Sequence, residues 1–236
     1  MNDLFSAFDW LADQSNWIGV SGIPHRLAQH LAITAVVMVT AMVIALPVGV
    51  LIGHIHRGAG VVGAVTGAAR AIPTLGLLTL FGLWLGIGLP APMLALTVLA
   101  MPSLLAGAYA GVQAVSPATT EAARAIGMSQ WRLVWQVEIP LAAPVIIGGI
   151  RAATLQVVST ATLAAYIADS GLGRYLFIGL KSRDYAQMLG GALLVITLAL
   201  VLELSLAGAQ HLVSVRVTNP RAAKEPVASN HTKGGI

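Results

Sequence analysis

Cysteine is absent from the 236 residues, which excludes disulfide bonds, thiol nucleophiles and cysteine-ligated metals. Charge is also scarce, because only 9% of the residues are Asp, Glu, Lys or Arg, against about a quarter in a typical soluble domain. The net charge of +4 comes from scattered positions, so no nucleic-acid-binding surface is expected. The sequence also lacks a G-x-x-x-x-G-K-[ST] phosphate-binding loop, so any nucleotide is expected to bind elsewhere.

Apolar residues are abundant, at 57% of the sequence. No charged residue occurs between positions 71 and 120, a run long enough for two membrane-spanning helices of about 20 residues. Further uncharged runs cover 31–52, 152–168 and 185–202. The alternating pattern of a membrane barrel is missing, and backbone groups inside a bilayer must be satisfied within their own segment. The sequence therefore predicts an all-α, polytopic membrane protein.

About five spans are expected, at roughly 27–53, 58–88, 92–115, 140–167 and 186–213. The second is interrupted by Ile72-Pro73, where a kink or break is expected because proline removes a helical hydrogen bond. A complete split there would give six spans. The expected organisation is an N-terminal segment outside the membrane at 1–24, a transmembrane domain at 25–213 and a disordered polar tail at 214–236.

The distribution of Lys and Arg predicts the orientation. With a charged loop at 116–140 placed in the cytoplasm, seven basic residues fall inside and four fall outside, apart from Arg70 and Arg151 within spans. This count favours an N-terminus outside the cell and a C-terminus in the cytoplasm. The first 25 residues contain no Lys or Arg, so we expect no cleaved signal peptide.

A charged insert, 119-TTEAARAIGMSQWRLVWQVEIP-140, interrupts the apolar pattern. Ser116-Pro117 is a favourable helix start, with a hydroxyl at the N-cap and proline at the first helical position. Gly127 tolerates the left-handed conformation that ends helices, and Ser129 can cap a second helix. That second helix carries residues suited to the membrane interface, Trp131, Arg132 and Trp135.

The first short helix of the insert has a face of small residues. Ala122, Ala125 and Ile126 share it at i, i+3, i+4 spacing, and Glu121 and Arg124 are placed to pair at i, i+3. Small side chains let another backbone approach closely, so this helix is suited to a groove on a partner. The spacing leaves open the alternative of an interfacial connector without a partner.

The insert resembles a known motif. Glu121-Ala122-Ala123, three residues, Gly127, nine residues and 137-VEIP-140 match the EAA loop of bacterial ABC-importer permease subunits, whose pattern ends in Ile-x-Leu-Pro. Val137 and Ile139 depart from that pattern conservatively. The segments 71-AIPTLGLLTLFGLWLGIG-88 and 148–180 are similar to the glycine betaine/carnitine/choline branch of this family, and the resemblance covers about residues 25–212.

The resemblance implies a type I ABC importer permease fold in a bacterial cell membrane, with no cofactor and no covalent chemistry in this chain. Two permease subunits, identical or homologous, would form the pathway in the lipid bilayer. A short cytoplasmic coupling helix of each would dock on one subunit of an ATPase dimer, and an extracytoplasmic binding protein would deliver a quaternary ammonium solute. The ATPase-coupling residues carried over are Glu121, Ala122, Ala123, Gly127 and Pro140.

Charged residues within or at the edge of spans are functional candidates, because an unpaired charge there is costly. Arg151 and Glu203 could form a structural pair, Arg70 and Glu203 could snorkel, and Arg151 could line the pathway. Pro73 and Thr74 follow the expected break, and interrupted helices at membrane depth can border a cavity. They are therefore candidates for lining or gating, with packing around the proline as the alternative.

Several other readings stay open or are weak. The same architecture could import amino acids or other small solutes, and an ATP-independent secondary transporter or channel would be favoured by inverted repeats, which we do not see. The stretch 19-GVSG-22 matches an intramembrane protease signature but precedes the first span, so a loop is expected. His54 and His56 could touch a metal, although boundary residues fit better. With 6% aromatics, a quaternary ammonium cage is expected on the binding protein.

Overall fold

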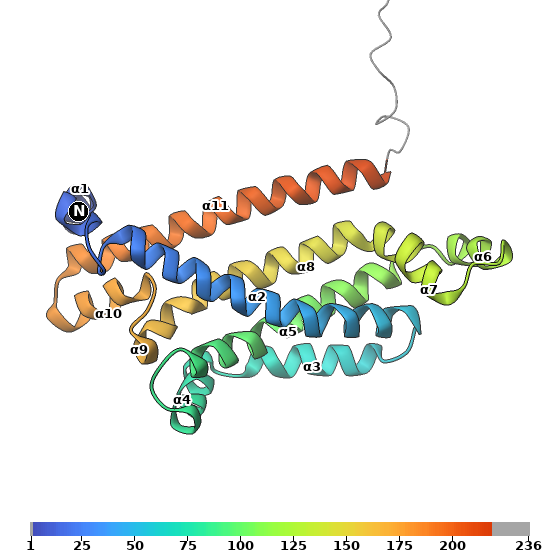
Figure 1. Cartoon of the computed structure of the whole chain (residues 1–236), viewed down its shortest axis with the longest axis horizontal. Coiled ribbons are helices and arrows are strands. Elements are labelled where there is room, and N and C mark those ends of the chain that lie inside the picture. Colours follow the sequence, from blue (N-terminus) through green and yellow to red (C-terminus); the bar gives the residue numbers. More distant parts are fainter. Residues whose placement is uncertain (1, 219–236) are drawn as a thin grey trace, which may run out of the picture.

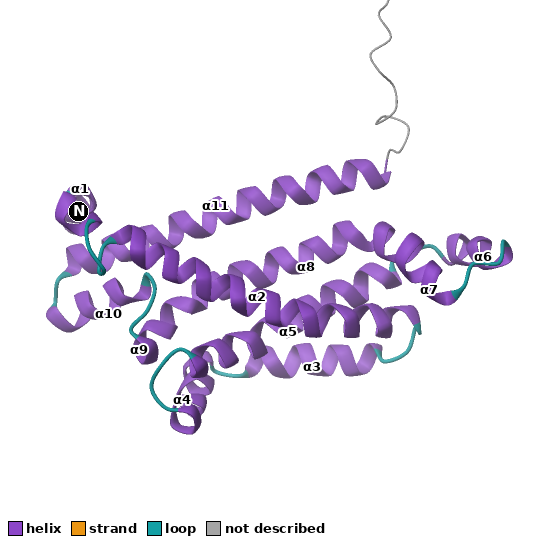
Figure 2. Ribbon diagram, viewed as in Figure 1, coloured by secondary structure: helices purple, strands orange, loops and turns teal. Residues whose placement is uncertain are grey.

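The computed structural model describes residues 2–218, and within that range every regular element is a helix (Figure 2). The all-α prediction is therefore confirmed. The expected polar tail begins later than predicted, because the last helix continues beyond position 214 to Thr218. The rest of that tail, 219–236, lies outside the described residues.

Four long helical stretches run along the length of the molecule (Figure 1). Each is long and apolar enough to cross a membrane. They are α2 (Ile23–His54), α5 (Pro90–Gln113), α8 (Ile139–Thr160) and α11 (Tyr185–Thr218). Short helices extend α8 at both ends, namely α7 (Gln130–Leu133), η2 (Val134–Glu138), η3 (Ala161–Ala164) and α9 (Ala165–Ala168).

The predicted break in the second span is confirmed. The region folds as α3 (Ala59–Ala71) and α4 (Thr74–Leu85), which are bent by 83° relative to each other. Ile72 and Pro73 both have extended backbone angles, so neither belongs to a helix. Counted as one broken span, this pair gives the expected total of about five within the described residues.

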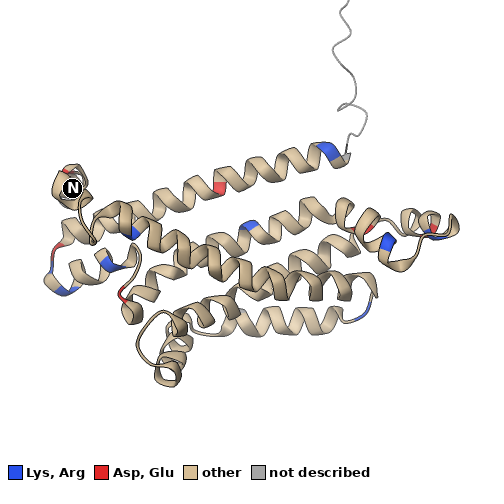
Figure 3. Ribbon diagram, in the orientation of Figure 1, with Lys and Arg blue, Asp and Glu red and all other residues tan. Residues whose placement is uncertain are grey.

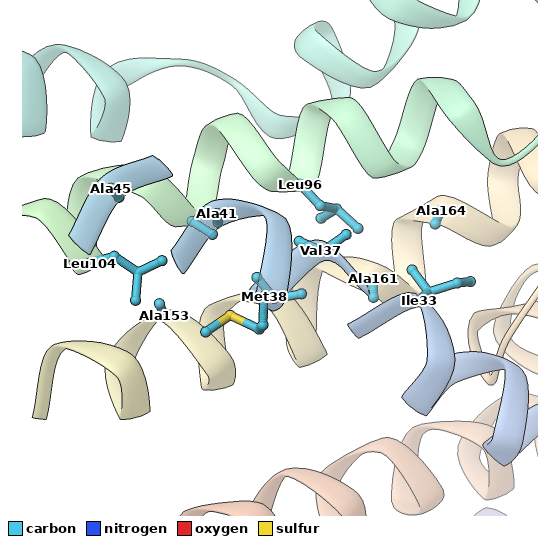
Figure 4. Close-up of a cluster of buried hydrophobic side chains, with 12 residues drawn as sticks. Ile33, Val37, Met38, Ala41, Ala45, Leu96, Leu104, Ala153, Ala161 and Ala164 are labelled. Carbon is cyan, nitrogen blue, oxygen red and sulfur yellow. The ribbon is translucent and has the colours of Figure 1, made fainter. Parts of the chain in front are cut away.

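Small residues hold the bundle together. Ala41 of α2, Ala153 of α8 and Ala161 of η3 are at most 1% exposed and pack with Leu96 and Leu104 of α5 (Figure 4). Helices in a bilayer gain no hydrophobic driving force from burying apolar surface, so close backbone contact between small residues supplies much of the association energy. One such contact joins α5 to α8, where a Cβ built on Gly107 would lie 2.7 Å from the Cα of Gly149.

Charged residues lie mostly at the two ends of the bundle, with one basic position midway along α8 and one acidic position midway along α11 (Figure 3). These two are Arg151 and Glu203, which form an ion pair, so the predicted structural pair is confirmed. The Arg151 Nε donates to Glu203 Oε2 at 2.9 Å, and Arg151 Nη1 donates to Gln210 Oε1 at 2.8 Å. This network ties α11 to the rest of the bundle.

The end of the bundle opposite the charged insert, called the α1 end below, is covered by short helices. They are α1 (Asn2–Ala12), η1 (Gln14–Trp17) and α10 (Gly173–Ser182). Trp10 of α1 packs against a small apolar cluster that includes Ile23, Leu172 and Tyr175. The stretch 19–22 lies in the turn between η1 and α2, which confirms the predicted loop.

The contact between Gly107 and Gly149 makes a testable prediction. Gly149→Ala would place a Cβ 2.8 Å from the Cα of Gly107, and overpacking of this kind costs about 1–3 kcal/mol. Gly208→Ala on α11 is the control, because a Cβ there meets nothing within 4 Å and alanine favours a helix. We expect Gly149→Ala to lower the unfolding temperature of the detergent-purified protein and Gly208→Ala to leave it unchanged or raise it. Equal effects would contradict the close contact.

Candidate functional site

The charged insert projects beyond one end of the bundle (Figure 1). It begins with α6 (Pro117–Ala125), turns sharply, and returns through α7 and η2 into α8. Among the short elements, α6 contacts α7 and η2. The insert is therefore a helical hairpin in which α6 packs against the two elements that follow it. One side of α6 is left facing away from the molecule.

Local sequence signals set both ends of α6. Gly127 has a φ of +82°, the backbone N–H of Met128 donates to the carbonyl of Ala123 at 3.2 Å, and that of Gly127 donates to Arg124 at 2.9 Å. This is a Schellman motif, so the predicted glycine stop is confirmed. The helix does begin after Ser116, but the Ser116 hydroxyl makes no capping bond, and the prediction of a side-chain cap is wrong. Its backbone carbonyl instead accepts the N–H of Thr119 at 3.0 Å.

The second helix of the insert starts as predicted. The Ser129 hydroxyl accepts the backbone N–H of Arg132 at 3.5 Å. Trp131 and Trp135 lie one turn apart with ring centroids 5.4 Å from each other, and both side chains are largely exposed. Such exposed tryptophans suit the boundary between a bilayer and water.

The faces of α6 are distinct. Thr120 and Ala123 are 7% exposed and turn toward the molecule, whereas Ala118, Ala122 and Ala125 are exposed on the opposite face beside Glu121. Ala123, predicted from the resemblance to act in coupling, therefore packs within this chain. The predicted Glu121–Arg124 pair is not among the ion pairs of the described residues, so the Glu121 carboxylate is open to a partner.

The return path of the insert contains a buried acid that the sequence reading missed. Glu138, at the end of η2, is 2% exposed, and its carboxylate accepts from Nδ1 of His54 at 2.7 and 3.0 Å. His54 is the last residue of α2, so this hydrogen bond links the insert to the first long helix. The element that positions Glu138 is a π-helical turn, a feature often found at functional sites. The sequence signal that could have indicated this buried contact is an acidic residue between two apolar residues at the edge of a span.

An apolar groove of about 670 Å³ lies beside this contact. Its walls are mostly aliphatic and aromatic side chains of α2, α7, η2 and α8, including Met42, Leu46, Trp131 and Trp135. His54 lines the groove as well. The groove is therefore bordered by the hydrogen bond between His54 of α2 and Glu138 of the insert.

The remaining candidates are dispersed. Pro73 is exposed in the bend before α4, and Thr74 is partly exposed at the start of that helix. Arg151 is engaged by Glu203 and Gln210, and Pro140 is exposed at the start of α8. The side chain of Arg70 lies outside the described residues. The described residues contain no group of three His, Cys, Asp or Glu side chains that could hold a metal, so His54 and His56 do not form such a site.

A family model for the binding-protein-dependent transport system inner membrane component matches residues 45–219. The chain belongs to this family. A family member is a transport subunit, not an enzyme, and works in a membrane with a separate ATPase and a substrate-binding protein. The sequence-based identification of a permease is therefore confirmed.

Relatives within this permease family include osmoprotectant transporters. The chain is 34% identical to the glycine betaine/carnitine/choline transport system permease protein OpuCB of Bacillus subtilis (strain 168), over 78% of this chain and 84% of the relative. It is also 34% identical to the choline transport system permease protein OpuBB of the same organism, over 79% and 86%. Among solved structures, an inward-facing MetNI methionine ABC transporter matches with a TM-score of 0.67 and 25% identity, over 78% of this chain and 93% of that chain. The predicted type I importer fold is confirmed.

The permease insert contains two glutamates with opposite surroundings, which makes a testable contrast. Glu138→Ala should remove about 1–3 kcal/mol of stability, because it leaves the His54 donor without its buried partner. His54→Ala should cost less when Glu138 is already alanine, a non-additivity measured by a double-mutant cycle of unfolding free energies. Glu121→Ala, on the exposed face of α6, should leave the unfolding free energy unchanged. Additive single effects would show that the His54–Glu138 contact contributes nothing.

Proposed function

We propose that this chain is the permease subunit of an ABC importer for quaternary ammonium compatible solutes, of the glycine betaine, choline, carnitine and proline-type class. The architecture supports a role in transport, and the names of its 34%-identical relatives support this substrate class. The observation that carries the coupling role is the exposed face of α6, where three alanines and Glu121 point away from the molecule. This face is the docking surface for the ATPase.

Three connections transmit force from that surface. Two are covalent, because α5 leads into α6 through residues 114–116 and η2 continues directly into α8. The third is the hydrogen bond from His54 to Glu138, which joins the insert to the end of α2. A displacement of α6 by ATP-driven closure of the ATPase dimer therefore moves α2, α5 and α8 together. The Schellman turn at Gly127 and the burial of Ala123 keep α6 rigid relative to α7 during that displacement.

The orientation follows from the docking partner. ATP is cytoplasmic, so the insert and the C-terminal end of α11 lie in the cytoplasm and the α1 end lies outside. A second permease subunit, identical or homologous, completes the pathway. Apolar side chains on α4 are widely exposed in the single chain, with Leu83 at 83% and Trp84 at 73%, and need cover from this second subunit or from lipid. Pro73, Thr74 and Arg151 remain candidates for lining or gating.

Coupling is tested by a charge placed on the docking face. Ala122→Glu should put an unpaired carboxylate in the contact with the ATPase and weaken assembly by about tenfold or more. Ala114→Glu is the matched control, because Ala114 is also an exposed alanine but lies before α6 at the end of α5. Two quantities are measured. The first is the amount of ATPase that co-purifies with the chain, and the second is the rate of ATP hydrolysis by proteoliposomes during transport. Wild-type assembly and hydrolysis in Ala122→Glu would overturn the docking role of α6.

Substrate class is tested by uptake. Proteoliposomes that contain this chain with its co-purifying ATPase and binding protein should accumulate labelled glycine betaine in an ATP-dependent manner, and unlabelled carnitine should compete. Methionine should neither accumulate nor compete. Uptake of methionine in place of glycine betaine would favour an amino-acid importer, and uptake that persists without the ATPase would favour a secondary transporter.

A further inference from the structure

A second cavity lies at the α1 end of the bundle, on the side away from the charged insert (Figure 1). Its volume is about 280 Å³, it is open on one side, and it is lined by residues of α1, η1, the start of α2, α10 and α11. The lining includes Trp10, Ser21, Arg26, Arg174 and Tyr175. Figure 3 shows basic positions on α10 and at the start of α2. None of these residues belongs to the coupling machinery.

The two arginines that line the cavity are only partly satisfied. Arg26 is 9% exposed, and its Nη1 donates to the Asp169 backbone carbonyl at 2.8 Å and to Gln29 Oε1 at 3.0 Å. Arg174 forms an ion pair with Asp169 through its own Nη1. The Nε atoms of both arginines are buried and have no acceptor among the described residues. A buried charged group that lacks an acceptor is costly, so an acceptor supplied by a ligand would be favoured.

The charge around the cavity is unbalanced. No Asp or Glu is among the lining residues, and Asp169 pairs with Arg174 from a position in which more than half of its side chain is exposed. Among the ion pairs of the described residues, these two guanidinium groups have one partly solvated carboxylate as a partner, that of Asp169. A planar carboxylate fits the fork of a guanidinium group and would restore the balance.

The rest of the wall is aromatic and apolar. Trp10 and Tyr175 meet edge to face with ring centroids 5.1 Å apart. The Tyr175 hydroxyl already donates to the Ser21 carbonyl at 2.6 Å and the residue is 6% exposed, so Tyr175 contributes a small part of its ring, and not its hydroxyl, to the wall. Aromatic rings attract quaternary ammonium groups through the negative charge of their faces.

We propose that this cavity binds a small zwitterionic solute, with its carboxylate held by Arg26 and Arg174 and its quaternary ammonium group against Trp10 and Tyr175. The proposal rests on the proposed function, which brings such solutes to the outer side. The volume fits a small solute, because pockets for drug-sized ligands span about 300–1,000 Å³. Glycine betaine has both groups, whereas choline has the ammonium group and no carboxylate. The cavity therefore discriminates between substrates that share the same cation.

The test is direct binding to the purified full-length chain in detergent, without ATPase or binding protein, by titration calorimetry. Glycine betaine should bind at least about tenfold more tightly than choline, and excess acetate should compete with it. Arg174→Gln should lower the affinity for glycine betaine about tenfold, and Arg174→Lys should recover part of it by restoring the charge without the planar fork. Lys181→Gln, on the same helix but outside the cavity lining, is the charge-matched control and should bind as the wild type does.

Equal binding of choline and glycine betaine, or undiminished binding by a folded Arg174→Gln variant, would overturn the proposal. So would a chain that binds no free solute while Arg174→Gln weakens its complex with the binding protein, because the arginines would then serve protein docking. Binding is measured without the transport partners, so its failure is distinguishable from failure of the uptake that tests the proposed function.

Discussion

The constraint on which the structure depends is that polar groups inside an apolar bundle must find partners within it. His30 illustrates this in α2, where it is fully buried. Its Nδ1 accepts the backbone N–H of Leu172 at 3.4 Å, so Nε2 carries the proton shared with the Val158 carbonyl at 3.0 Å. One side chain thus joins α2, α8 and the segment before α10. Because polar residues are scarce, each such contact restricts how the helices it joins can be arranged.

The remaining polar contacts show which long helices pack closely and which lie farther apart. Gln156 donates to the Leu99 carbonyl at 3.2 Å and links α8 to α5, where the glycines also bring the two backbones together. The Arg151 network links α8 to α11 through longer side chains, so these helices stand farther apart. The tightly packed helices α2, α5 and α8 therefore form a rigid unit, and the charged insert is attached to all three of them.

The two ends of this rigid unit use arginine and glutamate in contrasting ways. At the insert, Glu138 is buried and paired with His54, whereas Glu121 is exposed and forms none of the ion pairs of the described residues. At the α1 end, Arg26 and Arg174 each bind Asp169 through one nitrogen atom, and their Nε atoms have no acceptor among the described residues. In our proposals, the first end meets a protein partner and the second binds a small solute.

Features that depend on neighbouring residues could be predicted from the order of the amino acids alone. The apolar runs fixed the long helices, Pro73 fixed the break between α3 and α4, and Gly127 fixed the end of α6, because backbone preferences act locally. The spacing of the EAA-type motif was also visible without a structure, and it led to the family.

Contacts between residues far apart in the chain could not be predicted in this way. His54 and Glu138 are 84 positions apart, and Arg26 reaches the carbonyl of a residue 143 positions away. Helical periodicity placed Ala122 and Ala125 on one face of α6, but it could not tell that Ala123 turns inward. That depends on the path of the chain through α7 and η2. The physical reason is that side-chain partners across the bundle are set by how whole helices pack, which no local pattern encodes.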